Sequence, residues 1–156
     1  MKPLVAALSF LALTACGGGA AMAPPTPTIT LAPGASTLTV RIERVKTDRG
    51  PLFCDLFNAA EGFPGPSPIV GGSLQIAASG EPVCAWSNLP AGEYAVSVIQ
   101  DENANGTLDS NVLGVPLEGF GASNNVLPAT SAPRWSDSRV SVDGSTPLTL
   151  TVRLQN

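Results

Sequence analysis

The strongest constraint on the fold of this chain is a two-residue alternation of apolar and polar side chains. In residues 37–43, Leu38, Val40 and Ile42 alternate with threonine, arginine and glutamate. Successive side chains of a β-strand point to opposite faces, so this pattern indicates a strand with one buried face. The alternation returns in residues 148–154, and no segment keeps a helical period over about eleven residues. The sequence therefore predicts an all-β fold.

Turn-forming segments separate the short apolar or alternating runs. The chain has 16 glycines and 15 prolines, residues that favour turns and end strands. Short strands with such turns between them are typical of a sandwich, and we expect an immunoglobulin-like or transthyretin-like antiparallel β-sandwich as a single domain over residues 36–156. The expected strands cover residues 36–45, 51–57, 73–77, 83–87, 94–100, 139–142 and 147–154, with loops over residues 58–72 and 101–137.

The first fifteen residues differ from the rest of the chain. Lys2 precedes an apolar stretch over residues 4–13, and small residues follow, which is the layout of a secretory signal peptide. The stretch is shorter than the roughly 20 apolar residues that span a bilayer. Its end, LTAC at residues 13–16, resembles the lipobox of bacterial lipoproteins, in which a peptidase cuts before the cysteine and its sulfur receives diacylglycerol. The alternative is an ordinary signal peptide followed by an incidental cysteine.

The lipobox implies that residues 1–15 are a signal peptide and that Cys16 is lipidated. Residues 16–35, rich in glycine, alanine and proline and without charge after Cys16, then form a flexible tether. Two or three acyl chains on Cys16 would anchor the protein stably to a membrane, which is its first expected partner. Gly17 follows in place of aspartate, which by resemblance to bacterial sorting rules favours the outer membrane. We expect an exported protein facing the periplasm or the exterior.

The other two cysteines are expected to form a disulfide. An exported protein meets an oxidising compartment, and with Cys16 lipidated only Cys54 and Cys84 remain. The alternation in residues 51–57 puts Cys54 on the same face as Leu52 and Leu56, pointing inward. The alternative is a pair of buried free thiols. We expect no zinc site, since two cysteines alone cannot complete a tetrahedron and no histidine is present to help.

Composition removes several classes of function. The chain has no histidine, which excludes Ser-His-Asp and Cys-His nucleophiles and histidine-based metal sites. Its formal net charge is −4, and only 13% of the residues are charged. Scattered basic residues on an acidic chain give no electrostatic surface for nucleic acid. Nucleic acid is therefore not an expected partner.

Residues 101–109 have the spacing of a calcium-binding loop. Oxygen-bearing side chains stand at the first, third, fifth and ninth places, and Gly106 at the sixth permits a sharp turn. Calcium takes six to eight oxygen ligands, and spacing by two lets a tight loop direct successive side chains inward. The expected ligands are the side chains of Asp101, Asn103, Asn105 and Asp109 and the carbonyl of Thr107.

The loop departs from an EF-hand at its twelfth place. Val112 stands where an EF-hand has its bidentate glutamate, and Glu118 could close the shell by folding back. A strand precedes the loop, so calcium would bind on a β-scaffold and not between two helices. The alternative is an Asx-Gly turn without an ion, since these residues form turns in any case.

Several motifs resemble one bacterial family. The turn LPAGEY at residues 89–94 resembles the strand entry of transthyretin-like and collagen-adhesin B-type domains, with Tyr94 expected to bury its ring and pair its hydroxyl. Together with the loop at residues 101–109, the motifs GVPLEGFG, SNN and PRW resemble the domain-of-unknown-function 2141 family of exported bacterial proteins. The resemblance covers residues 38–154 and implies the fold and an ion loop, but no activity. The three later motifs lie at residues 114–121, 123–125 and 133–135.

These patterns favour a non-catalytic envelope module with a structural or partner-binding role. Its partner would be an envelope protein or a glycan. A second hypothesis is a carbohydrate- or peptide-binding module that uses Trp86, Phe120 or Trp135 as a stacking platform. A third is a small hydrolase with paired carboxylates from Asp101, Asp109 or Glu118, which would have to lie about 5–9 Å apart. We expect no catalytic residues.

Overall fold

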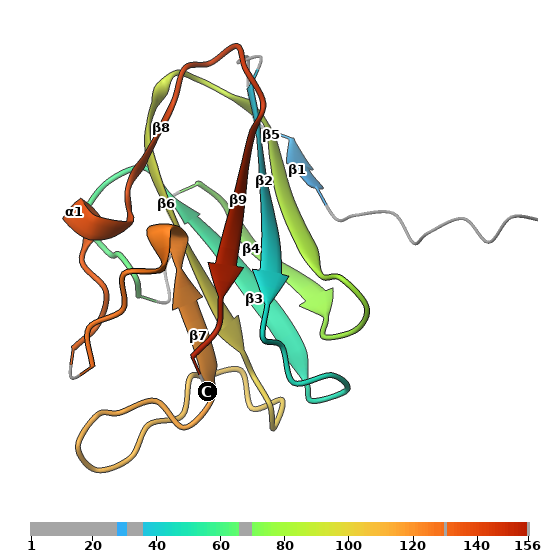
Figure 1. Cartoon of the computed structure of the whole chain (residues 1–156), viewed down its shortest axis with the longest axis vertical. Helices are drawn as coiled ribbons and strands as arrows, with labels where there is room; N and C mark the ends of the chain where they lie inside the picture. Colours follow the sequence, from blue (N-terminus) through green and yellow to red (C-terminus); the bar gives the residue numbers. More distant parts are fainter. Residues whose placement is uncertain (1–27, 31–35, 66–69, 130, 156) are drawn as a thin grey trace, which may run out of the picture.

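The computed structural model describes residues 28–30, 36–65, 70–129 and 131–155 (Figure 1). Cys16, the signal peptide and most of the expected tether lie outside these residues. The described strands form two sheets that pack face to face, which confirms the predicted all-β sandwich. No helix in the described part of the chain is long and apolar enough to cross a membrane.

The first sheet has the strand order β1-β5-β2-β9. Its strands are β1 (Thr28–Thr30), β2 (Ser36–Glu43), β5 (Val83–Leu89) and β9 (Leu148–Arg153). β2 and β5 are antiparallel, whereas β1 runs parallel to β5 and β9 runs parallel to β2. The sandwich is therefore not antiparallel throughout, because both outer strand pairs of this sheet are parallel.

The second sheet has the strand order β4-β3-β6-β7. It consists of β3 (Pro51–Phe57), β4 (Val70–Ala77), β6 (Gly92–Gln100) and β7 (Gly119–Ala122), all antiparallel. β8 (Val140–Val142) pairs with the first residues of β6. The central strand β6 thus ends directly at the start of the predicted calcium loop.

The core between the sheets follows the predicted alternation. β2 and β3 each direct every second side chain inward, and the disulfide between Cys54 and Cys84 joins β3 of one sheet to β5 of the other. The predicted disulfide is therefore confirmed, and both of its cysteines are fully buried. The fully buried side chains of this core include Leu38, Val40, Leu52, Leu56, Trp86, Leu89, Val96, Val98 and Val152.

The turn before β6 has the predicted corner geometry. The Tyr94 ring is buried, and its hydroxyl donates a hydrogen bond of 3.1 Å to the carbonyl oxygen of Pro90. This pairing leaves the phenolic hydroxyl satisfied at the edge of the core.

Three segments differ from the sequence expectations. β1 lies inside residues 16–35, which were expected to be a flexible tether, and Ile29 packs against the core. β4 begins at Val70, three residues before the predicted strand. Residues 101–137 contain β7, a short 3-10 helix at Ser123–Asn125 and the one-turn helix α1 at Trp135–Ser138, where the sequence predicted only loops and turns.

Strand β7 was missed because its sequence, GFGA, resembles a turn. A glycine is needed at Gly121, since a Cβ there would lie 2.6 Å from Cγ1 of Val152 on β9. The close approach of β7 to β9 therefore depends on the residue type that concealed the strand.

Candidate functional site

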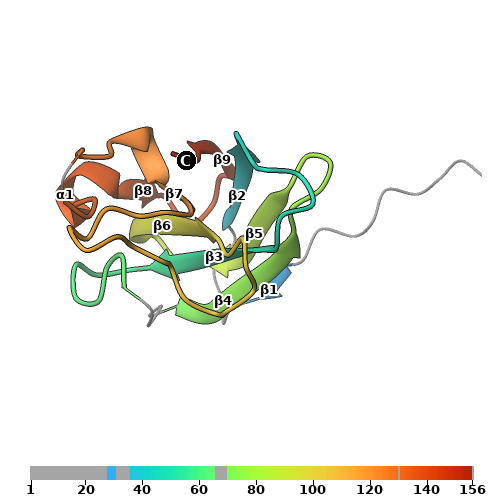
Figure 2. The same ribbon diagram turned by 90° about the horizontal axis from the view of Figure 1, so that it is seen from below.

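The predicted calcium loop, residues 101–109, forms the first half of the connection between β6 and β7, residues 101–118, at one end of the sandwich (Figures 1 and 2). Asp101 follows β6 directly, and only 2% of its surface is exposed. Its carboxylate accepts hydrogen bonds from the backbone N–H of Asn105 at 3.1 Å and of Gly106 at 2.8 Å. Gly106 has a φ of 82°, the left-handed conformation that the predicted sharp turn needs. The first ligand candidate therefore organises the turn.

The two asparagines of the loop form consecutive side-chain turns. The Asn103 side-chain oxygen accepts the N–H of Asn105 at 3.0 Å. The Asn105 side-chain oxygen accepts the N–H of Thr107 at 2.9 Å and its hydroxyl at 2.8 Å. Spacing by two thus produces the tight winding that the sequence predicted.

Asp109 closes the group of predicted ligands. The Asn103 amide donates to its Oδ2 at 2.7 Å, and the Asn105 amide donates to both carboxylate oxygens at 3.1 Å. Asn103, Asn105 and Asp109 are therefore in direct contact. Asp101 and Thr107 are linked to them through Asn105.

Glu118 is also brought to the loop, by a different kind of contact. Its side chain is buried, and its two carboxylate oxygens accept the backbone N–H of Glu102 and of Asp109, each at 2.9 Å. Glu102 is held in turn by Lys46, whose Nζ lies 2.6 Å from its Oε1. Glu118 thus joins the two ends of the ligand segment. In the described part of the chain, no three His, Cys, Asp or Glu side chains are close enough together to hold a metal ion.

The aromatic candidates lie in different surroundings. Trp86 is fully buried in the core, so its proposed role as a stacking platform is wrong. The Trp135 ring is half-buried and meets Phe63 edge to face at 5.9 Å, and Phe63 meets Phe57 at 5.2 Å in the same manner. Phe120 is half-buried on β7 and lines a pocket. Only Trp135 and Phe120 remain available for stacking.

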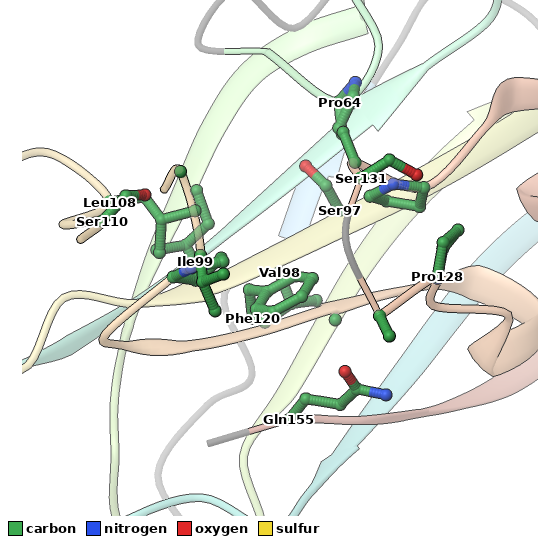
Figure 3. Close-up of a pocket in the computed structure, with 17 residues that line it drawn as sticks. Pro64, Ser97, Val98, Ile99, Leu108, Ser110, Phe120, Pro128, Ser131 and Gln155 are labelled. Carbon is green, nitrogen blue, oxygen red and sulfur yellow. The ribbon is translucent and has the colours of Figure 1, made fainter. Parts of the chain in front are cut away.

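The outer face of the second sheet has two neighbouring pockets that the sequence did not predict. One, of about 230 Å³, is lined by Ser97, Ile99 and Phe120 together with loop residues (Figure 3). The other, of about 540 Å³, is lined by Asp55 and Phe53 and by part of the loop. The only sequence signal was a charged residue inside the apolar strand PLFCDLF. The sequence does not show whether this aspartate, Asp55, is buried, because that depends on the segments that cover the outer face of β3.

Burial also changes the ionisation of Asp55. Only 6% of this residue is exposed, and desolvation raises the pKa of its carboxyl, opposed by a hydrogen bond with Ser73. A desolvated carboxylate beside a hollow is a frequent feature of binding sites.

Comparison with known proteins gives one family. The family model for DUF2141, described as an uncharacterized protein conserved in bacteria, matches residues 40–149. A search of the curated proteins and a search of the solved structures each gave no match. The matched span contains β3 to β8, the complete loop 101–118 and both cysteines of the disulfide. Because this span is well over half of the chain, the chain belongs to the DUF2141 family.

Proposed function

We propose that this chain is a non-catalytic, lipid-anchored module of the bacterial cell envelope whose loop 101–118 binds calcium and then presents a rigid surface to a partner. The observation that carries the calcium proposal is the mutual contact of Asn103, Asn105 and Asp109 beside the buried carboxylate of Asp101. Hard oxygen donors gathered in one tight loop match the preference of Ca²⁺.

Calcium would take the place of the side-chain amide groups that now donate hydrogen bonds to Asp109. The amides of Asn103 and Asn105 donate to this carboxylate. On binding, their oxygens would turn toward the ion and join Asp101, Asp109 and the carbonyl of Thr107. With two carboxylates and two neutral amides, we expect an affinity near the weak extracellular range, about 10⁻⁴–10⁻³ M.

Glu118 has a supporting role in this proposal. Both of its oxygens accept backbone N–H groups, of Glu102 and Asp109, so it fixes the positions between which the ligands lie. We therefore infer that Glu118 positions the loop without binding the ion. The direct ligands would be Asp101, Asn103, Asn105, Thr107 and Asp109.

Calcium at about 10 mM is expected to stabilise the protein by about 1–3 kcal/mol, since it would bind only the folded state. The melting temperature should then rise by several degrees and fall again with chelator. Asp109→Asn should abolish this shift, whereas Asp48→Asn, which removes an exposed carboxylate elsewhere, should preserve it. Differential scanning calorimetry of the full chain measures both. The absence of any shift in the unsubstituted protein would leave the segment as a plain Asx-Gly turn.

The anchor is tested separately. Metabolic labelling with a palmitate analogue is expected to mark the protein, and Cys16→Ser should abolish the label because the acceptor sulfur is lost. Cys54→Ala, which removes a cysteine of the folded domain, should keep it. A label that persists in the Cys16→Ser variant would contradict the lipoprotein assignment.

An apolar tip beside the calcium loop supports a partner-binding role. Val112 and Leu113 are 102% and 83% exposed, and Leu117 is 61% exposed. Large apolar side chains grouped on a loop are typical of interaction surfaces. Calcium bound at residues 101–109 would restrain this tip through the short connection between them.

A further inference from the structure

Strand pairing lines up a polar row and an apolar row on the outer face of the second sheet. Asp55 of β3 lies directly opposite Ser97 of β6. Two residues along the same strands, Phe53 lies opposite Ile99, which is opposite Phe120 of β7. Because side chains alternate along a strand, these residues face away from the core that holds Cys54.

The polar row, Asp55 and Ser97, is buried and only partly hydrogen-bonded. Asp55 and Ser97 are 6% and 4% exposed, yet Asp55 Oδ1 and Ser97 Oγ have no hydrogen-bond partner among the described residues. None of the ion pairs in the described part of the chain includes Asp55. Leaving a buried acceptor unpaired destabilises the folded state, and more so for a charged group. Native structures contain few such groups, so a second adjacent one indicates a use for them.

Both unpaired atoms belong to residues that line pockets. Ser97 lines the pocket of about 230 Å³, where Figure 3 shows its side chain among Pro64, Ile99 and Ser131. Asp55 lines the pocket of about 540 Å³, which also includes Pro64 and Ile99. The pockets therefore adjoin along Ile99. Their other walls are mainly apolar, with Phe53 and Leu108 on one side and Phe120 and Leu108 on the other.

We propose that this groove binds a primary organic amine, with the ammonium group between Asp55 and Ser97 and the apolar body along Ile99 and Phe120. An ammonium group supplies the cation that Asp55 lacks, and its three N–H donors are enough for both unpaired oxygens. An apolar groove with few converging polar groups suits a small ligand that has one polar end. The larger pocket borders two of the proposed calcium ligands, Asp101 and Thr107, but neither Asp55 nor Ser97 is one of those ligands.

Isothermal titration of the full chain with phenethylamine and with 2-phenylethanol, both in chelator, tests the proposal. The two probes share the apolar body and differ in the charged group. We expect saturable binding of the amine and at least about tenfold weaker binding of the alcohol, because a charge-assisted pair is lost. Equal affinity for both probes, or no saturable amine binding, would overturn the proposal. Chelator keeps this result independent of calcium.

Two variants assign the binding to the groove. Asp55→Asn should weaken amine binding by at least about tenfold and remove the preference over the alcohol, whereas Asp48→Asn, at an exposed carboxylate, should keep both. Ser97→Ala should weaken the amine by a smaller factor. Unchanged amine affinity in Asp55→Asn would overturn the proposal.

The Asp55→Asn variant is expected to fold at neutral pH. Burial raises the pKa of Asp55, so its ionisation opposes folding above that pKa, and a neutral amide removes this cost. Its melting temperature should equal or exceed that of the unsubstituted protein at neutral pH. The difference should shrink in acid, where Asp55 is protonated in both the folded and unfolded states.

Discussion

Replacing both Cys54 and Cys84 by alanine is expected to lower the free energy of unfolding by about 3–4 kcal/mol. The disulfide closes a loop with a sequence separation of 30 residues and joins the two sheets through the centre of the core. Without it, the unfolded chain regains the entropy that the cross-link removes. Urea unfolding of the full chain measures this loss as a lower midpoint concentration of urea. Reduction of the disulfide in the unsubstituted protein should lower the midpoint by a similar amount.

The matched control for this experiment is Cys16→Ser, whose substituted residue lies outside the described residues. It should leave the urea midpoint unchanged. Cys54 and Cys84 should also resist alkylation in the native protein until a reductant is added. A double alanine variant as stable as the Cys16→Ser control would contradict the prediction.

Glu118→Ala is expected to destabilise the loop by about 3 kcal/mol, because two backbone N–H groups lose a charged acceptor and each such bond contributes about 1.5–3 kcal/mol. Hydrogen exchange of the Glu102 and Asp109 amides should accelerate by about a hundredfold. Glu81→Ala is the control, since the Glu81 side chain is 92% exposed and its ion pair with Arg41 spans 3.9 Å. Exchange rates that match those of this control would show that Glu118 does not brace the loop.

The conservative variant Glu118→Gln separates positioning from coordination. Glutamine keeps one side-chain oxygen and therefore retains one of the two backbone contacts. If Glu118 positions the loop, Glu118→Gln should reduce the calcium-dependent rise in melting temperature less than Asp109→Asn does. An equal loss in both variants would make Glu118 a ligand and contradict the supporting role proposed above.

Local patterns carried most of the fold prediction. The alternation in β2 and β3 predicted the buried faces, and the turn before β6 predicted the hydroxyl contact of Tyr94. Two strands could not be read in this way. β1 is three residues long and is stabilised by its pairing with β5, while β7 is rich in glycine for reasons that lie on β9.

The two candidate sites also differ in whether their contacts are local in the sequence or depend on strand pairing. The contacts among Asp101, Asn103 and Asn105 span at most four residues, so their spacing in the sequence was sufficient to predict them. Asp55 and Ser97 are neighbours only through the register of β3 with β6. No local pattern encodes that register.

If Cys16 carries the proposed lipid anchor, strand β1 limits how far the domain can lie from the membrane. Thr28 is fixed to the sheet and stands twelve residues after Cys16, so the intervening chain can span at most about 40–43 Å. If the sheet began only at Ser36, the chain between Cys16 and the domain could span about 66–72 Å. The shorter connection would keep the domain in a thinner layer above the membrane. It would also raise the effective concentration of the domain toward other membrane-bound molecules. Three residues of parallel pairing would thereby favour partners on the same membrane over those further away.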